Sequence, residues 1–386
     1  MKEKLISLCL LTVLLCALVL PGCADGKEVV NFDPTTPHEN YRKVEPVGEV
    51  PHALNSIVQS NLFENIVAFD GVLLKVGSYD RDEVSQTITR TVQMLDPYGN
   101  ELASYTVRTD DAYYIDTLTA TDDGGFLFVL GFEDYAYGVA EWASSNGYAS
   151  RIIKCDKDGA LQFDVSLDGV EGSALRFCFE KEGKFYFFGS KETPEMKTQG
   201  VYSPTDIYMS ILDKNGTVLK SQCIAGSDYD SLHAAELSAD GFLLSVSSQS
   251  NDGDFSQFPH TRYPVDWVFA VSDELEITAK EKTSGRNFAD VKIGEKEGCP
   301  VYKSDAFLEN FDAGTPHAYI DYGDFYLIVS KNTTGLYEHQ PPWISALWLC
   351  AETVYSGYDK NGNLLFRAAV DSTLDYDVII DSMTNS

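Results

Sequence analysis

The sequence predicts an all-β protein, a β-propeller of four-stranded antiparallel blades, from three observations. Short runs of alternating apolar and polar residues flank tight turns in consecutive pairs, as at 213–216 (Asp-Lys-Asn-Gly) and 239–241 (Ala-Asp-Gly), which is typical of β-hairpins. The hairpin pair recurs with a period near 58 residues. No stretch keeps the apolar spacing of a helix. One hairpin pair has nothing to bury its apolar face against, so we expect an array of such units, which radial blades provide.

The repeats set the expected number of blades. The turn glycines of the first hairpin are Gly71, Gly125, Gly183, Gly241, Gly298 and Gly323. Their spacings are 54, 58, 58, 57 and 25 residues, and the second hairpin recurs only five times. The unit that opens near Phe288 therefore lacks its outer half, and the turn at 272–275 (Ser-Asp-Glu-Leu) lacks its glycine. We expect six blades with one reduced, and five as the alternative.

The first residues read as an export signal. Lys2 and Lys4 precede an apolar run over 5–20, which is short for a spanning helix, and Leu-Pro-Gly-Cys ends at Cys23. This pattern resembles a bacterial lipoprotein signal, and the resemblance implies a lipid on Cys23 and attachment to the extracytoplasmic face of the cell membrane. An ordinary secretory signal with a chance cysteine is the alternative. We expect a signal peptide over 1–22, a lipidated cysteine and Pro-rich flexible tether over 23–53, and the propeller domain over 54–386.

The repeats carry a resemblance of their own. An Asp-Gly turn followed by an apolar strand, and then Asp-x-x-Gly between two strands, resembles the repeats of bacterial surface lipoproteins with WD-like β-propellers. The resemblance covers residues 54–382. It implies the fold and leaves the function open, because propellers host many unrelated activities.

Charge excludes one class of partner. Lys and Arg number 29, Asp and Glu 59, and the net charge is −30. Such a surface repels phosphate backbones and anionic lipids, so we expect no nucleic-acid partner and contact with a membrane through the lipid anchor only. The alternative is that the charge simply keeps an exposed domain soluble.

Connections in a four-stranded meander alternate between the two ends of the sheet, so tight turns share one propeller face and long connections share the other. The long connections are 133–149, 191–205, 251–264 and 331–343. The candidate ligand-binding residues on that face are Trp142, Tyr148, Tyr202, Phe258, His260, Tyr337, His339, Trp343, Asp228 and Asp230. Loops rich in aromatic rings commonly form binding surfaces. Rings that pack down onto the blades and hold the loops in place are the alternative.

The function expected from these residues is non-catalytic binding of a carbohydrate or a protein at the cell surface. A propeller glycoside hydrolase or lyase, which needs two carboxylates at a suitable separation, is one alternative. A structural subunit of an envelope complex is another.

No cofactor and no metal ligand set is expected, because the Asp-Lys-Asp-Gly turns lack the spacing of a calcium loop. The carboxylate-rich stretch 251–254 is a better cation candidate than these turns. His233 and His317 share a repeat position without a third ligand.

Overall fold

A computed structural model describes most of the chain beyond residue 42. The described residues are 43–69, 71–77, 80–82, 85, 87–110, 113–132, 149–167, 173–192, 205–256, 265–283, 292–296, 299–302, 313–335 and 348–371. The chain divides into two compact units: one is Tyr41–Thr334 with Trp348–Leu374, and the other is Met1–Asn40 with Gly335–Leu347 and Asp375–Ser386. The sheets described below belong to the first unit, apart from Gly335 at the end of one strand.

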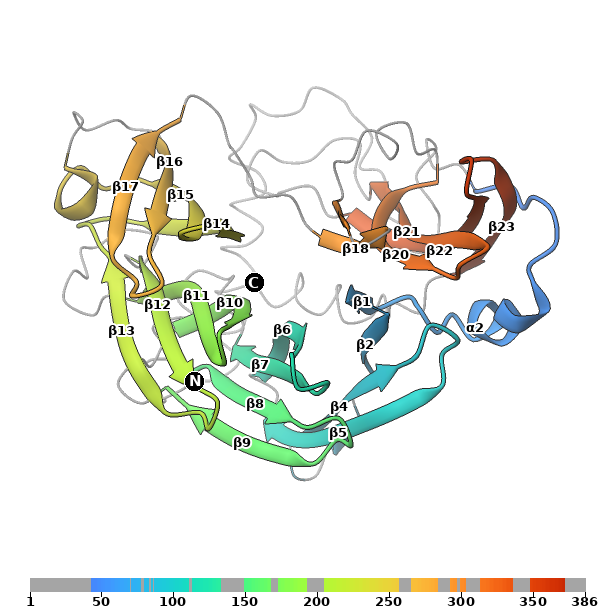
Figure 1. The fold of residues 1–386 in the computed structure, drawn as a ribbon, viewed down its shortest axis with the longest axis horizontal. Coiled ribbons are helices and arrows are strands. Elements are labelled where there is room, and N and C mark those ends of the chain that lie inside the picture. Colours follow the sequence, from blue (N-terminus) through green and yellow to red (C-terminus); the bar gives the residue numbers. More distant parts are fainter. Residues whose placement is uncertain are drawn as a thin grey trace, which may run out of the picture. The chain divides into compact units, whose positions relative to one another are not determined.

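The described residues form six antiparallel sheets, and the chain enters each of them in sequence order (Figure 1). The first sheet contains β1 (Ile66–Phe69), β2 (Val72–Val76), β4 (Thr87–Leu95) and β5 (Glu101–Asp110), with the short β3 (Asp80–Asp82) beside β4. The second contains β6 (Tyr113–Ala120), β7 (Phe126–Phe132), β8 (Arg151–Cys155) and β9 (Leu161–Ser166). The third contains β10 (Ser173–Lys181), β11 (Lys184–Glu192), β12 (Thr205–Asp213) and β13 (Val218–Ile224).

The remaining sheets follow the same order. The fourth contains β14 (Asp230–Ser238), β15 (Gly241–Ser248), β16 (Val265–Val271) and β17 (Ile277–Lys282). The fifth has two described strands, β18 (Lys292–Lys296) and β19 (Cys299–Tyr302). The last contains β20 (Thr315–Asp321), β21 (Phe325–Gly335), β22 (Trp348–Asp359) and β23 (Leu364–Asp371). The all-β, four-stranded propeller class is confirmed, while the number of blades stays a prediction.

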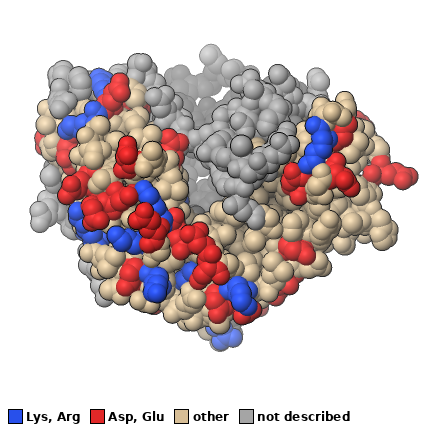
Figure 2. Space-filling model, viewed as in Figure 1, with Lys and Arg blue, Asp and Glu red and all other residues tan. Residues whose placement is uncertain are grey.

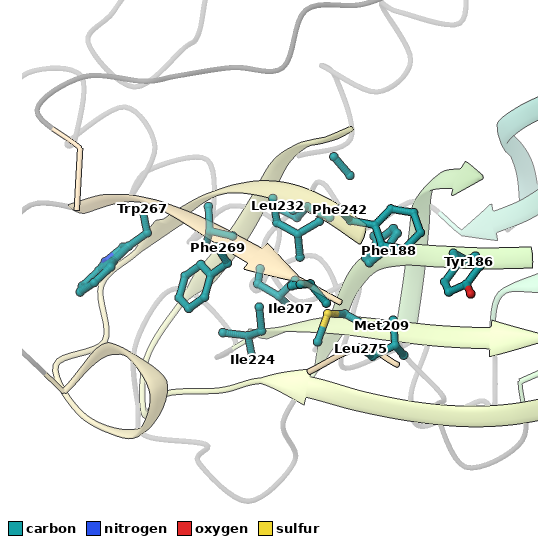
Figure 3. Packing of buried hydrophobic residues seen from close by; sticks show 14 of the residues in the cluster. Tyr186, Phe188, Ile207, Met209, Ile224, Leu232, Phe242, Trp267, Phe269 and Leu275 are labelled. Atoms are coloured by element: carbon teal, nitrogen blue, oxygen red, sulfur yellow. The ribbon is translucent and has the colours of Figure 1, made fainter. Parts of the chain in front are cut away.

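Strand alternation explains how the sheets pack face to face. In β7, Phe126 and Phe128 face a cluster shared with the first sheet, whereas Leu127 and Val129 face a cluster shared with the third. Successive side chains of a strand point to opposite faces, so a strand buried on both faces reads as an unbroken apolar run. Figure 3 shows the corresponding cluster between the third and fourth sheets, where Phe188 and Met209 meet Phe242 and Phe269.

The first and last sheets also meet. β1 contacts β20, and an apolar cluster joins the two sheets to a short N-terminal helix, α2 (Asn55–Gln59), which follows a 3-10 turn at His52–Leu54. Just before these helices, Val47 exchanges both backbone hydrogen bonds with Arg367 of β23, at 3.0 and 2.8 Å. The end of the stretch predicted as a tether thus lies along the outer strand of the last sheet. Among the described residues, no helix is long and apolar enough to cross a membrane.

The Asp-x-x-Gly turns hold neighbouring sheets together. Gly159 has a φ of +79°, and a Cβ there would lie 2.5 Å from the carbonyl oxygen of Ser104 in the preceding sheet. The turn at 272–275, which lacks the glycine, keeps the hydrogen bond of the other turns and a positive φ at its last residue. Leu275 adopts a φ of 59° and its N–H donates to the carbonyl of Ser272 at 2.9 Å. The side chain of Leu275 is fully buried in the cluster of the third and fourth sheets, and this burial offsets the cost of the left-handed backbone.

The first strands of five of the six described sheets share one irregularity. The register of β6, β10, β14, β18 and β20 shifts by one residue against the next strand, near the start of each strand. Arg176, His233 and His317 are the extra residues in three of these bulges. A bulge bends its strand and turns a side chain aside from the pleat.

Candidate functional site

The predicted binding residues divide into two groups. Those outside the described residues are Cys23, Trp142, Tyr148, Tyr202, Phe258, His260, Tyr337, His339 and Trp343. Asp228 and Asp230 are described, and they lie in and after the connection between β13 and β14. This connection belongs to the end of the sheet where the long connections were expected, and its surroundings contain a buried polar cluster.

Asp230 is the centre of that cluster. It opens β14 and is fully buried. The Ser248 hydroxyl donates to Oδ1 at 2.5 Å, and the Ser250 hydroxyl donates to Oδ2 at 3.2 Å. Its main-chain carbonyl accepts a hydrogen bond of 2.7 Å from the hydroxyl of Thr205 in the third sheet. The carboxyl group therefore sits where two sheets meet, with both oxygens held by hydroxyl donors.

Burial changes how Asp230 titrates. Desolvation raises the pKa of its carboxyl to about 7, against the opposing effect of the two serine hydrogen bonds. The charges of Asp206 and Asp228 raise the pKa further. Asp230 consequently changes its protonation state near neutral pH, which is unusual for an aspartate.

Asp206, the second residue of β12, is a second buried carboxyl group beside Asp230. It is 6% exposed, and its Oδ1 has no hydrogen-bond partner among the described residues. Burial raises the pKa of Asp206, and the charge of Asp254 adds to this effect. A hydrogen bond from the N–H of Gly226 and the charge of Lys191 act in the opposite direction. We call Asp206, Asp230, Ser248 and Ser250 together the Asp206–Asp230 site.

Gly226 and Ser250 connect the two carboxyl groups. A Cβ on Gly226 would lie 2.2 Å from both Cβ and Oγ of Ser250, so only glycine fits at this position. Ser250 Oγ, which donates to Asp230, also accepts the N–H of Asp228 at 3.0 Å. The pair is thus bridged by a close backbone approach and a hydroxyl group.

The loop that follows β15 fixes this arrangement. Ala225 N–H donates to Asp254 Oδ2, and Asp254 N–H donates to the carbonyl of Ala225, both at 2.9 Å. Asp252 Oδ1 accepts the N–H of Ser227 at 2.8 Å. The carboxylates of 251–254, the stretch named as a cation candidate, therefore serve as acceptors for a neighbouring loop. Within the described part of the chain, no three metal-binding side chains are grouped so that they could hold an ion.

The other sequence candidates do not join this site. The Asp-Lys-Asn-Gly turns are held internally, as where Asp213 Oδ1 accepts the N–H groups of Asn215 and Thr217 at 2.8 Å. Nε2 of His317 lies 3.2 Å from the carbonyl oxygen of Phe63, at the joint between the last and first sheets.

Sequence reasoning missed Asp206, Ser248 and Ser250. Asp206 lies in a strand whose residues are nearly all buried, so it reads as part of an ordinary core strand. Ser248 is directly opposite Asp230 in the β14–β15 register, and this pairing was a usable signal.

Comparison with known proteins shows only distant likeness. No family model and no curated protein matches the chain. Similar solved structures include a mutant of Synechocystis apocarotenoid oxygenase, with a TM-score of 0.35 and 11% identity over 78% of this chain and 58% of that one. They also include a cobalt-substituted form of that oxygenase, with a TM-score of 0.33 and 13% identity over 79% and 61% of the two chains. An ACO/RPE65 chimera has a TM-score of 0.34 at 11% identity, with 79% and 61% covered. The chain thus spans about three fifths of the length of these structures.

These findings correct the expected function. The prediction of a non-catalytic surface protein that binds a carbohydrate or a protein is contradicted by these similar solved structures, which are those of an apocarotenoid oxygenase and of chimeras made from it. The likeness is too slight to assign an oxygenase activity to this chain.

Proposed function

We propose that this chain is an enzyme that catalyses proton transfer, with the Asp206–Asp230 pair as its acid and base. The observation that carries the proposal is the fully buried carboxyl of Asp230, which titrates near neutral pH beside a second buried carboxyl with an unpartnered oxygen. A buried titratable group that is shifted by both desolvation and a specific charged neighbour marks a candidate functional site.

The two carboxyl groups have environments that suit different roles. Asp230 keeps its proton up to about pH 7, so it can act as a general acid at neutral pH and below. Asp206 has the Gly226 N–H and the charge of Lys191 to favour its ionised form, so it is the better general base. Burial raises the pKa of both carboxyls, that of Asp230 to about 7, and two neighbouring carboxyls in different surroundings can divide the acid and base roles.

Turnover of uncharged chromogenic esters and acetals, followed from pH 5 to pH 9, tests the proposal. We expect a limb of the kcat/KM profile near pH 7, and we expect Asp230→Asn and Asp206→Asn each to lower kcat by about 10²- to 10⁴-fold, the usual contribution of a positioned acid or base. Asp240→Asn is the matched control, because Asp240 is exposed in the turn between β14 and β15. If the two carboxyls are purely structural, we expect no turnover, or turnover that both Asp→Asn variants retain.

We further propose that the chain is a lipoprotein anchored to the extracytoplasmic face of the cell membrane through Cys23. The support is the short apolar run that ends in Leu-Pro-Gly-Cys. Metabolic labelling with an alkyne fatty acid should modify the expressed full chain, and Cys23→Ser should abolish the label and release the protein from membranes. Label that survives this substitution would place the lipid on another residue. A full chain that takes up no label would contradict the lipid anchor.

A further inference from the structure

The Asp206–Asp230 site has an excess of negative charge that the described residues do not balance. The carboxyl groups that act on one another there are Asp206, Asp228, Asp230 and Asp254. The described cations in contact with them or acting on them are Lys191 and Lys280. Lys280 Nζ donates to the main-chain carbonyl of Asp254 at 2.6 Å, so it is engaged outside the pair. The charge of Lys191 acts on Asp206 and favours its ionised form.

Among the described residues, Oδ1 of Asp206 is the oxygen of this site that has no donor. A buried carboxylate oxygen without a hydrogen bond is costly, because its lost hydration is not replaced. Oδ1 is nevertheless buried, in a residue that is 6% exposed and acts electrostatically on Asp230. A donor brought by a ligand would satisfy this oxygen and offset the negative charge at the same time.

The chemistry of the cluster favours an organic cation over a metal ion. A divalent metal needs several carboxylates grouped around one point, and the described residues contain no such group. Three carboxylates around the pair already accept backbone N–H groups, at Ala225, Ser227 and Tyr229. An ammonium group needs fewer carboxylate partners than a metal ion, since one charge-assisted N–H bond to a single oxygen is enough to orient it.

The acidic surface of the protein also favours a cationic ligand over an anionic one. Acidic side chains gather over the face of the described residues shown in Figure 2, with lysines and arginines between them. The chain as a whole carries a net charge of −30. Such a field raises the local concentration of cations and lowers that of anions.

We propose that the Asp206–Asp230 site binds a substrate with a protonated amino group, and that Asp206 Oδ1 accepts its N–H. The inference rests on the proposed function, since it names the substrate class of the same site. Asp206 provides the charge-assisted contact. Asp230 is the group that partly releases its proton when the cation binds. The surrounding charged groups are Asp228 in the β13–β14 connection, Asp254 in the loop after β15, Lys191 of β11 and Lys280 of β17.

Calorimetric titration of the folded full chain with n-butylammonium at pH 7 tests the inference, with n-butanol as the neutral probe of the same shape. We expect the amine to bind and the alcohol not to bind. Because a cation favours the ionised form of Asp230, titration in two buffers of different ionisation enthalpy should show proton release, which Asp230→Asn abolishes. Asp206→Asn should weaken amine binding by at least about tenfold, the value of one charge-assisted hydrogen bond. Asp240→Asn should bind like the wild type.

Several results would overturn the inference. Equal binding of amine and alcohol, no loss in Asp206→Asn, or displacement of the amine by equimolar Ca²⁺ would each do so. If Asp206→Asn fails to fold, the pH dependence of the wild type decides: binding has to be lost between pH 7 and pH 4, and binding that persists at pH 4 contradicts the role of Asp206. Turnover of uncharged substrates with a limb near pH 7, but without amine binding, would keep the acid–base enzyme and refute the substrate class.

Discussion

Lys154 of β8 is buried among the blades, and its ammonium group lies 3.0 Å from both carboxylate oxygens of Asp123. The same nitrogen donates to the carbonyl of Cys155 at 2.8 Å. The two partners are unequal, since the Lys154 side chain is 2% exposed and that of Asp123 is 47% exposed. Burial opposes ionisation of Asp123, but hydrogen bonds from Thr121 and Lys154 lower its pKa below the usual value.

This asymmetry predicts which half of the ion pair matters for stability. Asp123→Asn leaves a buried ammonium group without a counter-charge, and we expect it to lower the free energy of unfolding by roughly 2–4 kcal/mol. Lys154→Met leaves a carboxylate that water can reach and fills the same volume with an apolar chain, so its effect should stay within about 1 kcal/mol. Urea unfolding of both variants measures the difference. The reverse order would mean that Lys154 reaches solvent in the native state.

Asp230 makes stability depend on pH in a predictable direction. Its folded-state pKa of about 7 lies above the value of about 3.9 expected in the unfolded chain, so the native state holds this proton more tightly. Stability from this group is highest at low pH and falls as pH rises from about 4 to about 7, by at most about 4 kcal/mol.

Asp230→Asn removes that titration, so its stability relative to the wild type should rise between pH 4.5 and pH 8. Urea unfolding at the two pH values checks this, with Asp240→Asn as the control whose difference should not change. A constant difference for Asp230→Asn would mean that Asp230 stays ionised throughout this range.

Much of the fold could be predicted from the sequence because its signals are local. Apolar runs such as 126–130 indicate strands buried on both faces, and the Asp-x-x-Gly turns mark the hairpins. The turn ending at Leu275 lacks the glycine that the other turns carry, yet burial of the leucine side chain offsets its backbone strain, and this compensation depends on a neighbouring sheet. Local patterns do not reveal such compensation.

The site was only half predictable for the same reason. Asp228 and Asp230 stand out because they interrupt the repeat, whereas Asp206 is the second residue of a strand that reads as ordinary core. What makes Asp206 unusual is the meeting of the third and fourth sheets, where Thr205 donates to the carbonyl of Asp230. The desolvation that shifts both carboxyls arises from this packing and not from the composition of either strand.

Substitutions at two turn glycines distinguish the cost of backbone strain from the cost of disturbed packing between sheets. Gly159 and Gly183 have φ of +79° and +71°, but a Cβ on Gly159 meets the backbone of Ser104, whereas a Cβ on Gly183 meets nothing within 4 Å. We expect Gly183→Ala to cost about 1 kcal/mol from strain alone. Gly159→Ala should cost roughly 1–3 kcal/mol more, because the turn has to move away from the preceding sheet. Thermal unfolding of the two variants compares them, and equal costs would show that the turns contribute little to the contact between sheets.

Tyr355 links the last sheet to the segment that leads into the first sheet, so its substitution tests how much this contact contributes to stability. Its ring is fully buried in β22, its hydroxyl accepts the N–H of Phe63 at 3.1 Å, and it donates to Asn61 Oδ1 at 2.9 Å. Burial raises its pKa well above that of a free tyrosine, so the hydroxyl stays protonated at all ordinary pH values. Tyr355→Phe keeps the ring and leaves two buried polar groups unsatisfied, which should cost about 2–4 kcal/mol.

The effect of Tyr355→Phe should also be localised. The segment at Asn61 and Phe63 connects α2 to β1, so hydrogen exchange should accelerate in α2 and β1 before it does so in the third sheet, which packs against other neighbours. Tyr326→Phe is a suitable comparison, because that ring stacks in the same sheet, within the cluster that β18 and β19 share with it. Exchange that rises equally in all sheets would mean that the unit opens as a whole rather than at this joint.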